Sequence, residues 1–147
     1  MTTFQIIEAK PWHCGQMTRL LCPRHAQAAA DAGADMHREL RSRFEQSAFR
    51  RAWLINGDLA ALGGVTGSKI SAGGIVWLAL AERALYFRVA MVREARKQLT
   101  EIMRTKRQLC AAIVAGDDVS MRFAAFLGFE PNQKIEQFVL MDYRESA

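Results

Sequence analysis

Two short stretches of this 147-residue chain hold side chains that could carry chemistry. The first runs from Asp117 to Arg122 and follows an apolar segment that ends at Gly116. A carboxylate in the position of Asp117 can accept hydrogen bonds from the free amides of a first helical turn. Ser120 and Arg122 then lie near that turn, where a bound anion or cofactor would meet them.

The second stretch, His37 to Glu45, gathers titratable side chains that could transfer a proton to or from a substrate. His37 and Glu45 are the candidates for a base and its orienting partner, and Glu39 lies between them. Eight residues separate His37 from Glu45, a little over two helical turns, so they lie near one face without touching. Ordinary surface residues are the alternative, because such side chains are mostly exposed.

Hydrophobic periodicity predicts the elements that hold these stretches. Leu109–Val114 is an apolar run typical of a buried strand, and the segment after Asp117 has helical periodicity that Gly128 and Pro131 end. From Asp35 onward, apolar residues recur every four positions and predict an amphipathic helix whose buried face is formed by Met36, Leu40, Phe44 and Ala48.

The remaining chain predicts a single α/β domain over residues 1–147. Asn56-Gly57 between two apolar runs is typical of a two-residue turn in an antiparallel hairpin. Strand, helix and strand in succession predict two neighbouring parallel strands joined by a crossover helix. The further predicted elements are strand Phe4–Ala9, helices Trp12–Cys22 and Arg24–Ala34, strands Ala52–Ile55, Leu59–Val65 and Ile75–Leu80, helix Tyr86–Arg104 with Val89, Val92, Leu99 and Met103 on its buried face, and strand Lys134–Tyr143.

The net charge of +5 is concentrated in one segment. Between Glu82 and Arg107 there are eight basic and three acidic residues, a difference equal to the charge of the whole chain. The basic residues of Tyr86–Arg107 could make a weak contact with nucleic acid, hold the phosphates of a cofactor, or form the solvated face of a helix. No aromatic residues are interleaved with them as in proteins that stack single-stranded bases.

Several classes of protein are disfavoured by composition. No apolar run reaches the roughly 18 residues that span a bilayer, so we expect no membrane partner and a cytoplasmic location. Three scattered cysteines argue against a disulfide framework. Paired short spacings of the zinc-binding kind are missing, so we predict no metal site among His13, Cys14, Cys22, His25 and His37.

The order Asp117, Ser120, Arg122-Phe123 and Leu127-Gly128-Phe129 resembles the last motif of GNAT-fold acyltransferases. Together with matching residues between Gly74 and Met103, this motif also resembles that of a GNAT-like family encoded by tailed phages and related to internal virion proteins of podoviruses. The resemblance covers the C-terminal half of the chain, and its N-terminal part consists of Gly74–Leu78, Phe87, Arg96 and Met103.

The resemblance implies a mixed, mostly antiparallel sheet of about six to seven strands with a central parallel pair. It implies acetyl-CoA or CoA as a cofactor, aligned along the strand that contains Trp77, Leu78 and Ala79 and flanked by the helix with Asp117, Ser120 and Arg122. An active member would transfer the acyl group to an amine. A phage member would act in the host cytoplasm or the virion, with other phage proteins or copies of itself as partners.

Two departures from the GNAT pattern bear on activity. GNAT enzymes hold the pyrophosphate with an Arg/Gln-x-x-Gly-x-Gly/Ala turn, whereas the corresponding segment here, Leu80–Tyr86, has no glycine and contains Glu82. Many members place a tyrosine seven positions after the start of the last helix, and this chain has Ala124 there. A virion-associated or morphogenesis protein with a degenerate acetyl-CoA site is therefore the first hypothesis, and an active N-acyltransferase is the alternative.

Overall fold

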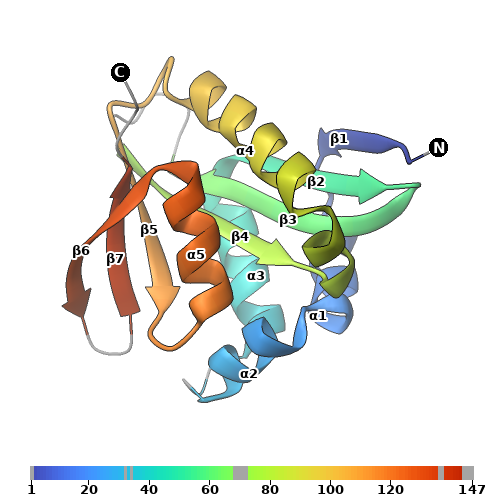
Figure 1. Ribbon diagram of the computed structural model, residues 1–147, viewed down its shortest axis with the longest axis horizontal. Coiled ribbons are helices and arrows are strands. Elements are labelled where there is room, and N and C mark those ends of the chain that lie inside the picture. The colour runs from blue at the N-terminus through green and yellow to red at the C-terminus, as the bar shows by residue number, and fades with distance from the viewer. Residues whose placement is uncertain (1, 32, 34, 68–72, 136–137, 144–147) are drawn as a thin grey trace.

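In the computed structural model, which describes residues 2–31, 33, 35–67, 73–135 and 138–143, one mixed sheet runs through the centre (Figure 1). Within that part of the chain the strand order is β1-β2-β3-β4-β5-β7-β6. All neighbouring strands are antiparallel except β4 and β5, which are parallel. The strands are β1 (Phe4–Glu8), β2 (Ser47–Ile55), β3 (Asp58–Thr66), β4 (Gly73–Leu80), β5 (Gln108–Val114), β6 (Phe129–Ile135) and β7 (Phe138–Tyr143). This topology confirms the predicted fold class.

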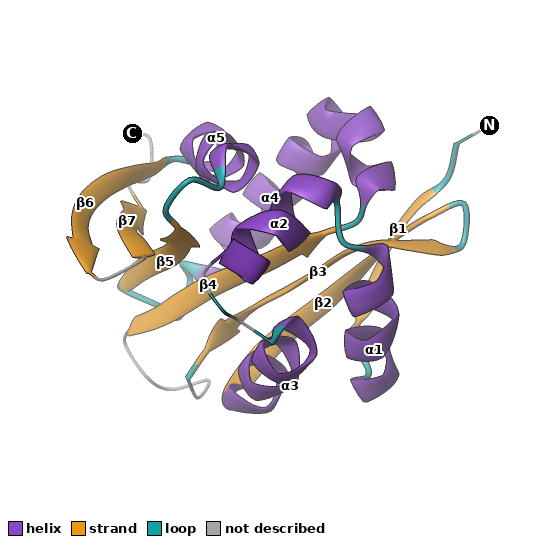
Figure 2. Cartoon of the chain, turned by 90° about the horizontal axis from the view of Figure 1, so that it is seen from below, coloured by secondary structure: helices purple, strands orange, loops and turns teal. Residues whose placement is uncertain are grey.

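Helices cover both faces of the sheet (Figure 2). One apolar cluster joins the sheet to α4 and α5, and a second joins it to α1 and α3. The helices are α1 (Pro11–Leu20), α2 (Pro23–Asp31), α3 (Met36–Gln46), the 3-10 helix η1 (Glu82–Phe87), α4 (Arg88–Ile102) and α5 (Asp118–Leu127). No helix among the described residues is both long enough and apolar enough to cross a bilayer.

The turns and helix ends that were predicted from Gly, Asn and Asp residues are confirmed. Asn56 and Gly57 have φ of 52° and 84°, and the strands on either side pair antiparallel as predicted. Asp117 caps α5, and Gly128 ends it in the left-handed conformation with φ of 105°. The predicted parallel pair is also confirmed, with a register from Gly73 opposite Gln108 to Val76 opposite Ala111.

Two predicted helical faces were wrong in part. The segment Tyr86–Arg104 begins as the tighter turns of η1, so α4 starts only at Arg88 and Val89 is 74% exposed. Leu99 is buried as predicted, Val92 and Met103 are partly buried, and Met91, Ala95 and Ile102 complete the buried face of α4. Ala48 does not extend the buried face of α3, because the helix ends at Gln46 and the chain enters β2, where Ala48 is exposed.

The predicted final strand Lys134–Tyr143 covers the last two residues of β6 and all of β7, and these are two strands that pair with each other. Sequence periodicity missed β6 because this edge strand reads FEPNQKI, and after Phe129 its side chains are exposed. Polar residues and a proline are common on edge strands, where no second neighbour needs the backbone amides.

Candidate functional site

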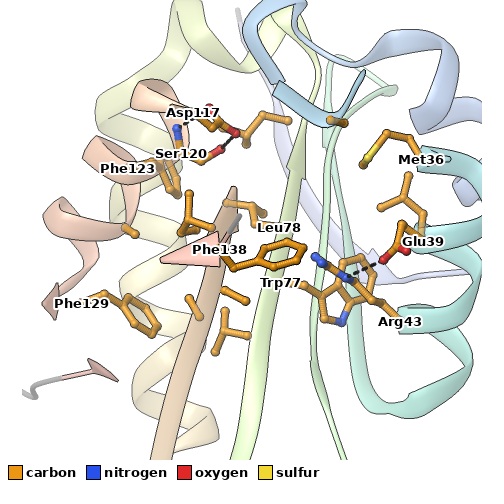
Figure 3. A pocket seen from close by; sticks show the side chains of 18 of the residues that line it. Met36, Glu39, Arg43, Trp77, Leu78, Asp117, Ser120, Phe123, Phe129 and Phe138 are labelled. Atoms are coloured by element: carbon orange, nitrogen blue, oxygen red, sulfur yellow. Dashed lines mark hydrogen bonds and ion pairs between the residues drawn. The ribbon is translucent and has the colours of Figure 1, made fainter. Parts of the chain in front are cut away.

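A cavity of about 310 Å³ opens where β4 and β5 diverge (Figure 3). The parallel ladder between the two strands ends at Val76 and Ala111, so the later parts of both strands border the cavity. α3 and α5 form opposite walls of it, and Phe129 and Phe138 add aromatic surface from β6 and β7.

β4 turns an open backbone edge toward this cavity. Leu80 lies opposite Ala61 of β3, and the amide of Ala81 donates to the carbonyl of Ala60 at 2.9 Å. Along a strand of an antiparallel ladder, the backbone N–H and C=O groups of successive residues point alternately toward the partner strand and away from it. Because Ala81 bonds to β3, the backbone groups of Leu80 and Leu78 point away from β3. The carbonyl of Leu80 accepts from the amide of Cys22 at 2.9 Å, so the α1–α2 junction covers the end of this edge.

Trp77 forms a fixed part of the cavity wall. Its indole Nε1 donates to Ser47 Oγ at 2.9 Å, and that hydroxyl donates to the carbonyl of Arg43 at 2.6 Å. Trp77 is 3% exposed and Ser47 is 4% exposed, so the hydrogen bond between the indole and the hydroxyl group is shielded from solvent. The network ties β4 and β2 to the last turn of α3.

Asp117 and Ser120 form a closed pair at the α5 end of the cavity. Asp117 is 3% exposed, and its two carboxylate oxygens accept from the amide of Ser120 at 3.2 Å and from Ser120 Oγ at 2.7 Å. The carboxylate therefore acts as the cap of α5. Neither oxygen is without a hydrogen-bond donor.

Glu39 and Arg43 form the charged wall on α3. Arg43 Nε lies 4.0 Å from Glu39 Oε2, and the side chains are 32% and 48% exposed for Arg43 and Glu39, respectively. Burial lowers the pKa of Arg43, and the nearby Glu39 carboxylate opposes this effect. In Figure 3 the guanidinium of Arg43 extends toward Phe138, across the opening between α3 and β7.

A second cavity of about 380 Å³ lies at the N-terminal ends of α4 and α5. Arg88, the first residue of α4, and Arg122 line it, together with Leu85, Val119, Cys22 and Pro23. Both arginines are exposed. This cavity is bordered by the same α1–α2 junction that covers the end of β4.

The structure brings together four of the residues that the sequence singled out and separates four others. Trp77, Leu78, Asp117 and Ser120 line the larger cavity, and Arg122 lines the second. Ala79 is buried in the apolar cluster beneath α1 and α3, and His37 and Glu45 are exposed on α3 and do not line either cavity.

Arg43 lines the cavity and was not singled out from the sequence, and Glu39 was named only as one of three titratable groups. The available signal was their opposite charge at a spacing of four residues beside the apolar positions Met36 and Leu40. Ala124 lines the cavity at the position where the resemblance implies a tyrosine, and no tyrosine is among the described lining residues.

No group of three His, Cys, Asp or Glu side chains that could hold a metal occurs in the part of the chain that the structure describes. The side chain of His25, one of the residues considered for zinc, lies outside the described residues. His13 is buried, and its Nδ1 accepts from the amide of Lys10 at 2.9 Å.

Comparison with known proteins relates this fold to solved structures. No family model matches the sequence, and no curated protein matches it. The PaiA N-acetyltransferase from Thermoplasma acidophilum, in complex with coenzyme A, superposes with a TM-score of 0.68 at 10% identity, covering 97% of this chain and 99% of that one. AAC(6')-Ib in complex with ribostamycin and coenzyme A gives 0.69 at 9% identity, over 96% and 93% of the two chains. A GNAT-family acetyltransferase from Streptococcus pneumoniae gives 0.59 at 14% identity, over 95% and 98%.

At these sequence identities the likeness concerns the fold alone. The superpositions cover nearly all of this chain and nearly all of each solved chain. The sheet order, the parallel β4–β5 pair and the flanking helices correspond to that likeness. The chain therefore has the fold of the GNAT acetyltransferases.

Proposed function

We propose that the protein binds acetyl-CoA or another acyl-CoA in the cleft between β4 and β5 and transfers the acyl group to an amine. The observation that carries the proposal is the open backbone edge of β4 at Leu78, which faces the cavity of about 310 Å³. The two amides of a pantetheine arm can pair with such an edge as an added strand does. Coenzyme A is bound in structures of the same fold, including the PaiA N-acetyltransferase.

Arg88 and Arg122 are our candidates for the phosphate end of the cofactor. They line the second cavity at the starts of α4 and α5, where the helix dipoles also favour negative charge. Guanidinium groups bind phosphate through charge-assisted hydrogen bonds. Two arginines would thus replace the glycine-rich turn that the segment Leu80–Tyr86 lacks.

Glu39 is our candidate for the base, because its carboxylate lines the cavity from the side of α3. In the proposed reaction the acceptor ammonium loses a proton to Glu39, and the amine nitrogen attacks the thioester carbonyl. A carbon–nitrogen bond forms, the attacking nitrogen releases its second proton to solvent, the carbon–sulfur bond breaks, and CoA leaves as the thiolate. A thiol pKa of about 8.5 makes the thiolate a tolerable leaving group, so it can take its proton from solvent although Ala124 offers none.

Calorimetric titration with CoA and with pantetheine, which lacks the phosphates, tests the cofactor site. Arg88→Gln and Arg122→Gln should each weaken CoA binding roughly tenfold or more and leave pantetheine binding unchanged. Arg93→Gln is the matched control, because Arg93 is exposed on α4 and lines neither cavity. Saturating CoA should raise the free energy of unfolding by about 2.7 kcal/mol at a hundredfold excess over its dissociation constant. No stabilisation at millimolar CoA would contradict the proposal.

Two observations favour a second candidate, a protein that keeps the fold and acts by contact with phage proteins or copies of itself. The segment Leu80–Tyr86 is glycine-free with Glu82 exposed, and Ala124 occupies the place of the expected tyrosine. In that case Ala124→Tyr should fail to produce acyl transfer even when CoA binds. For the enzyme, Ala124→Tyr should raise the rate of transfer above that of Ala124→Phe, which fills the same space without a hydroxyl group.

A further inference from the structure

We propose that the acceptor is a free α-amino acid with an apolar side chain, with its ammonium group bound by Glu39 and its carboxylate bound by Arg43. Acylation of this ligand rests on the proposed function, whereas its binding does not. The proposal follows from the charges, the geometry and the size of the cavity between α3, β4 and β5.

Three charged side chains line this cavity among the described residues: Glu39, Arg43 and Asp117. Both oxygens of Asp117 accept hydrogen bonds from Ser120, and Asp117 caps α5. Glu39 and Arg43 are therefore the charged groups that remain to meet a ligand. One acidic and one basic side chain next to each other match a molecule that carries a positive and a negative group on the same carbon atom, as an α-amino acid does.

The contact between Glu39 and Arg43 leaves most of their hydrogen-bonding capacity for a ligand. Only Nε of Arg43 approaches Glu39, at the long distance of 4.0 Å. A guanidinium has five N–H donors and can bind a carboxylate through two parallel hydrogen bonds, and a carboxylate has two acceptor oxygens for an ammonium group. Burial lowers the pKa of Arg43, so a second carboxylate would offset the cost of burying this cation.

Apart from Asp117 and Ser120, the side chains of the remaining wall are apolar. Trp77 and Met36 lie beside the charged pair, and Phe138 faces it from β7 (Figure 3). Leu40 lines the same cavity. A volume of about 310 Å³ is at the lower end of the range for small-molecule sites. Such a space accommodates one apolar side chain, and the adjacent cation favours a free carboxylate over the neutral amide that follows the N-terminal amine of a peptide.

A second pair on the same helix provides an internal comparison. Arg41 and Glu45 have the same spacing of four residues and an N–O distance of 3.8 Å, but neither lines the cavity. If Glu39 and Arg43 formed only a surface ion pair, removal of the Arg43 cation would change ligand affinity no more than removal of the Arg41 cation.

Binding of L-phenylalanine, L-phenylalaninamide and N-acetyl-L-phenylalanine, measured by calorimetry or saturation-transfer NMR without CoA, tests the proposal. Phenylalanine should bind at least roughly tenfold more tightly than the amide, which lacks the carboxylate, or the N-acetyl compound, which lacks the ammonium group. Arg43→Gln should lower the affinity for phenylalanine to that for the amide and leave the affinity for the amide unchanged. Glu39→Gln should lower the affinities for phenylalanine and for its amide, the two ligands that carry an ammonium group.

Arg41→Gln, the matched control, should leave all three affinities unchanged, and far-ultraviolet circular dichroism of each variant shows whether it is folded. Equal binding of phenylalanine and its amide, or equal effects of Arg41→Gln and Arg43→Gln, would overturn the proposal. Binding of CoA without binding of phenylalanine would also overturn it and leave the proposed cofactor site intact. Binding of phenylalanine in the expected pattern without binding of CoA would support this inference and refute the proposed acyl transfer.

Discussion

At the scale of single residues, two glutamates on α3 each contact an arginine of the same helix but differ in whether they line the cavity. Glu39 and Glu45 each lie four residues from an arginine that they contact, but only Glu39 lines the cavity. We expect Glu39→Gln to lower kcat/KM for acyl transfer by roughly 10²–10⁴-fold, the range typical of a general base, and Glu45→Gln to leave it unchanged. Steady-state kinetics of both variants checks this. A loss confined to Glu45→Gln would instead support the hypothesis drawn from the sequence.

His13 predicts a pH dependence of stability. Burial, and then the charge of Lys10, lowers the pKa of His13 below its ordinary value of 6.5, and the Lys10 amide donates to its Nδ1. The unfolded chain therefore takes up this proton at a higher pH than the folded chain. The free energy of unfolding should fall as the pH drops below about 6.5 and should level off beneath the lowered pKa.

Urea denaturation between pH 7.5 and pH 5 measures this effect in the wild-type protein and in His13→Asn. Asparagine keeps an acceptor for the Lys10 amide and has no proton to gain. The decrease in stability should be smaller in the variant. An identical decrease in both proteins would show that other groups cause it.

At the scale of elements, the hydrogen bonds that join Trp77, Ser47 and the Arg43 carbonyl connect β4, β2 and α3. Ser47→Ala leaves the buried indole N–H without an acceptor, which should cost about 1–3 kcal/mol. In a Trp77→Phe background the same substitution should cost less, because the donor is already absent. Thermal or urea unfolding of the two single variants and the double variant gives the coupling energy. Additive effects would mean that this hydrogen bond contributes nothing to stability.

Gly64 of β3 permits the close approach of β2 and Trp77. A Cβ atom at this position would overlap the carbonyl oxygen of Phe49 and lie 3.1 Å from two atoms of the Trp77 ring. Because a backbone oxygen cannot move without distorting β2, Gly64→Ala should destabilise the protein by about 1–3 kcal/mol or more. Gly73→Ala is the control, since the added atom would meet Gln108 only at an ordinary distance of 3.7 Å. Equal stability of the two variants would contradict this account.

Elements with strong local signals were the ones predicted from the sequence. Asn56-Gly57 specifies its turn by backbone conformation, and Asp117 and Gly128 mark both ends of α5 through capping. η1 was not recognised because a 3-10 helix of six residues is too short to show a hydrophobic period. β6 was missed because only Phe129 of this edge strand is buried.

At the scale of the whole molecule, the sheet topology apart from the edge strand β6 was predictable, and the charged wall of the cavity was not. The order of strands and helices follows from the chain, including the parallel pair that the crossover helix requires. The role of Arg43 depends on how α3 packs beside the diverging ends of β4 and β5, which no local pattern encodes. A contact of the basic segment Tyr86–Arg107 with nucleic acid remains a prediction.

The hydrogen bond from the Cys22 amide to the Leu80 carbonyl holds the α1–α2 junction against the end of β4, and under the proposed function this junction would report whether CoA is bound. Cys14 and Cys22 are fully buried, whereas Cys110 is partly exposed, so an alkylating reagent should modify Cys110 first. Modification of Cys22 requires the junction to detach from β4, and its rate therefore measures how often that occurs. Since Cys22 also lines the cavity with Arg88 and Arg122, CoA should slow its alkylation in a concentration-dependent manner, measured by mass spectrometry. The chain would thus carry its own kinetic probe, a thiol whose protection records when CoA occupies the cavity lined by Arg88 and Arg122.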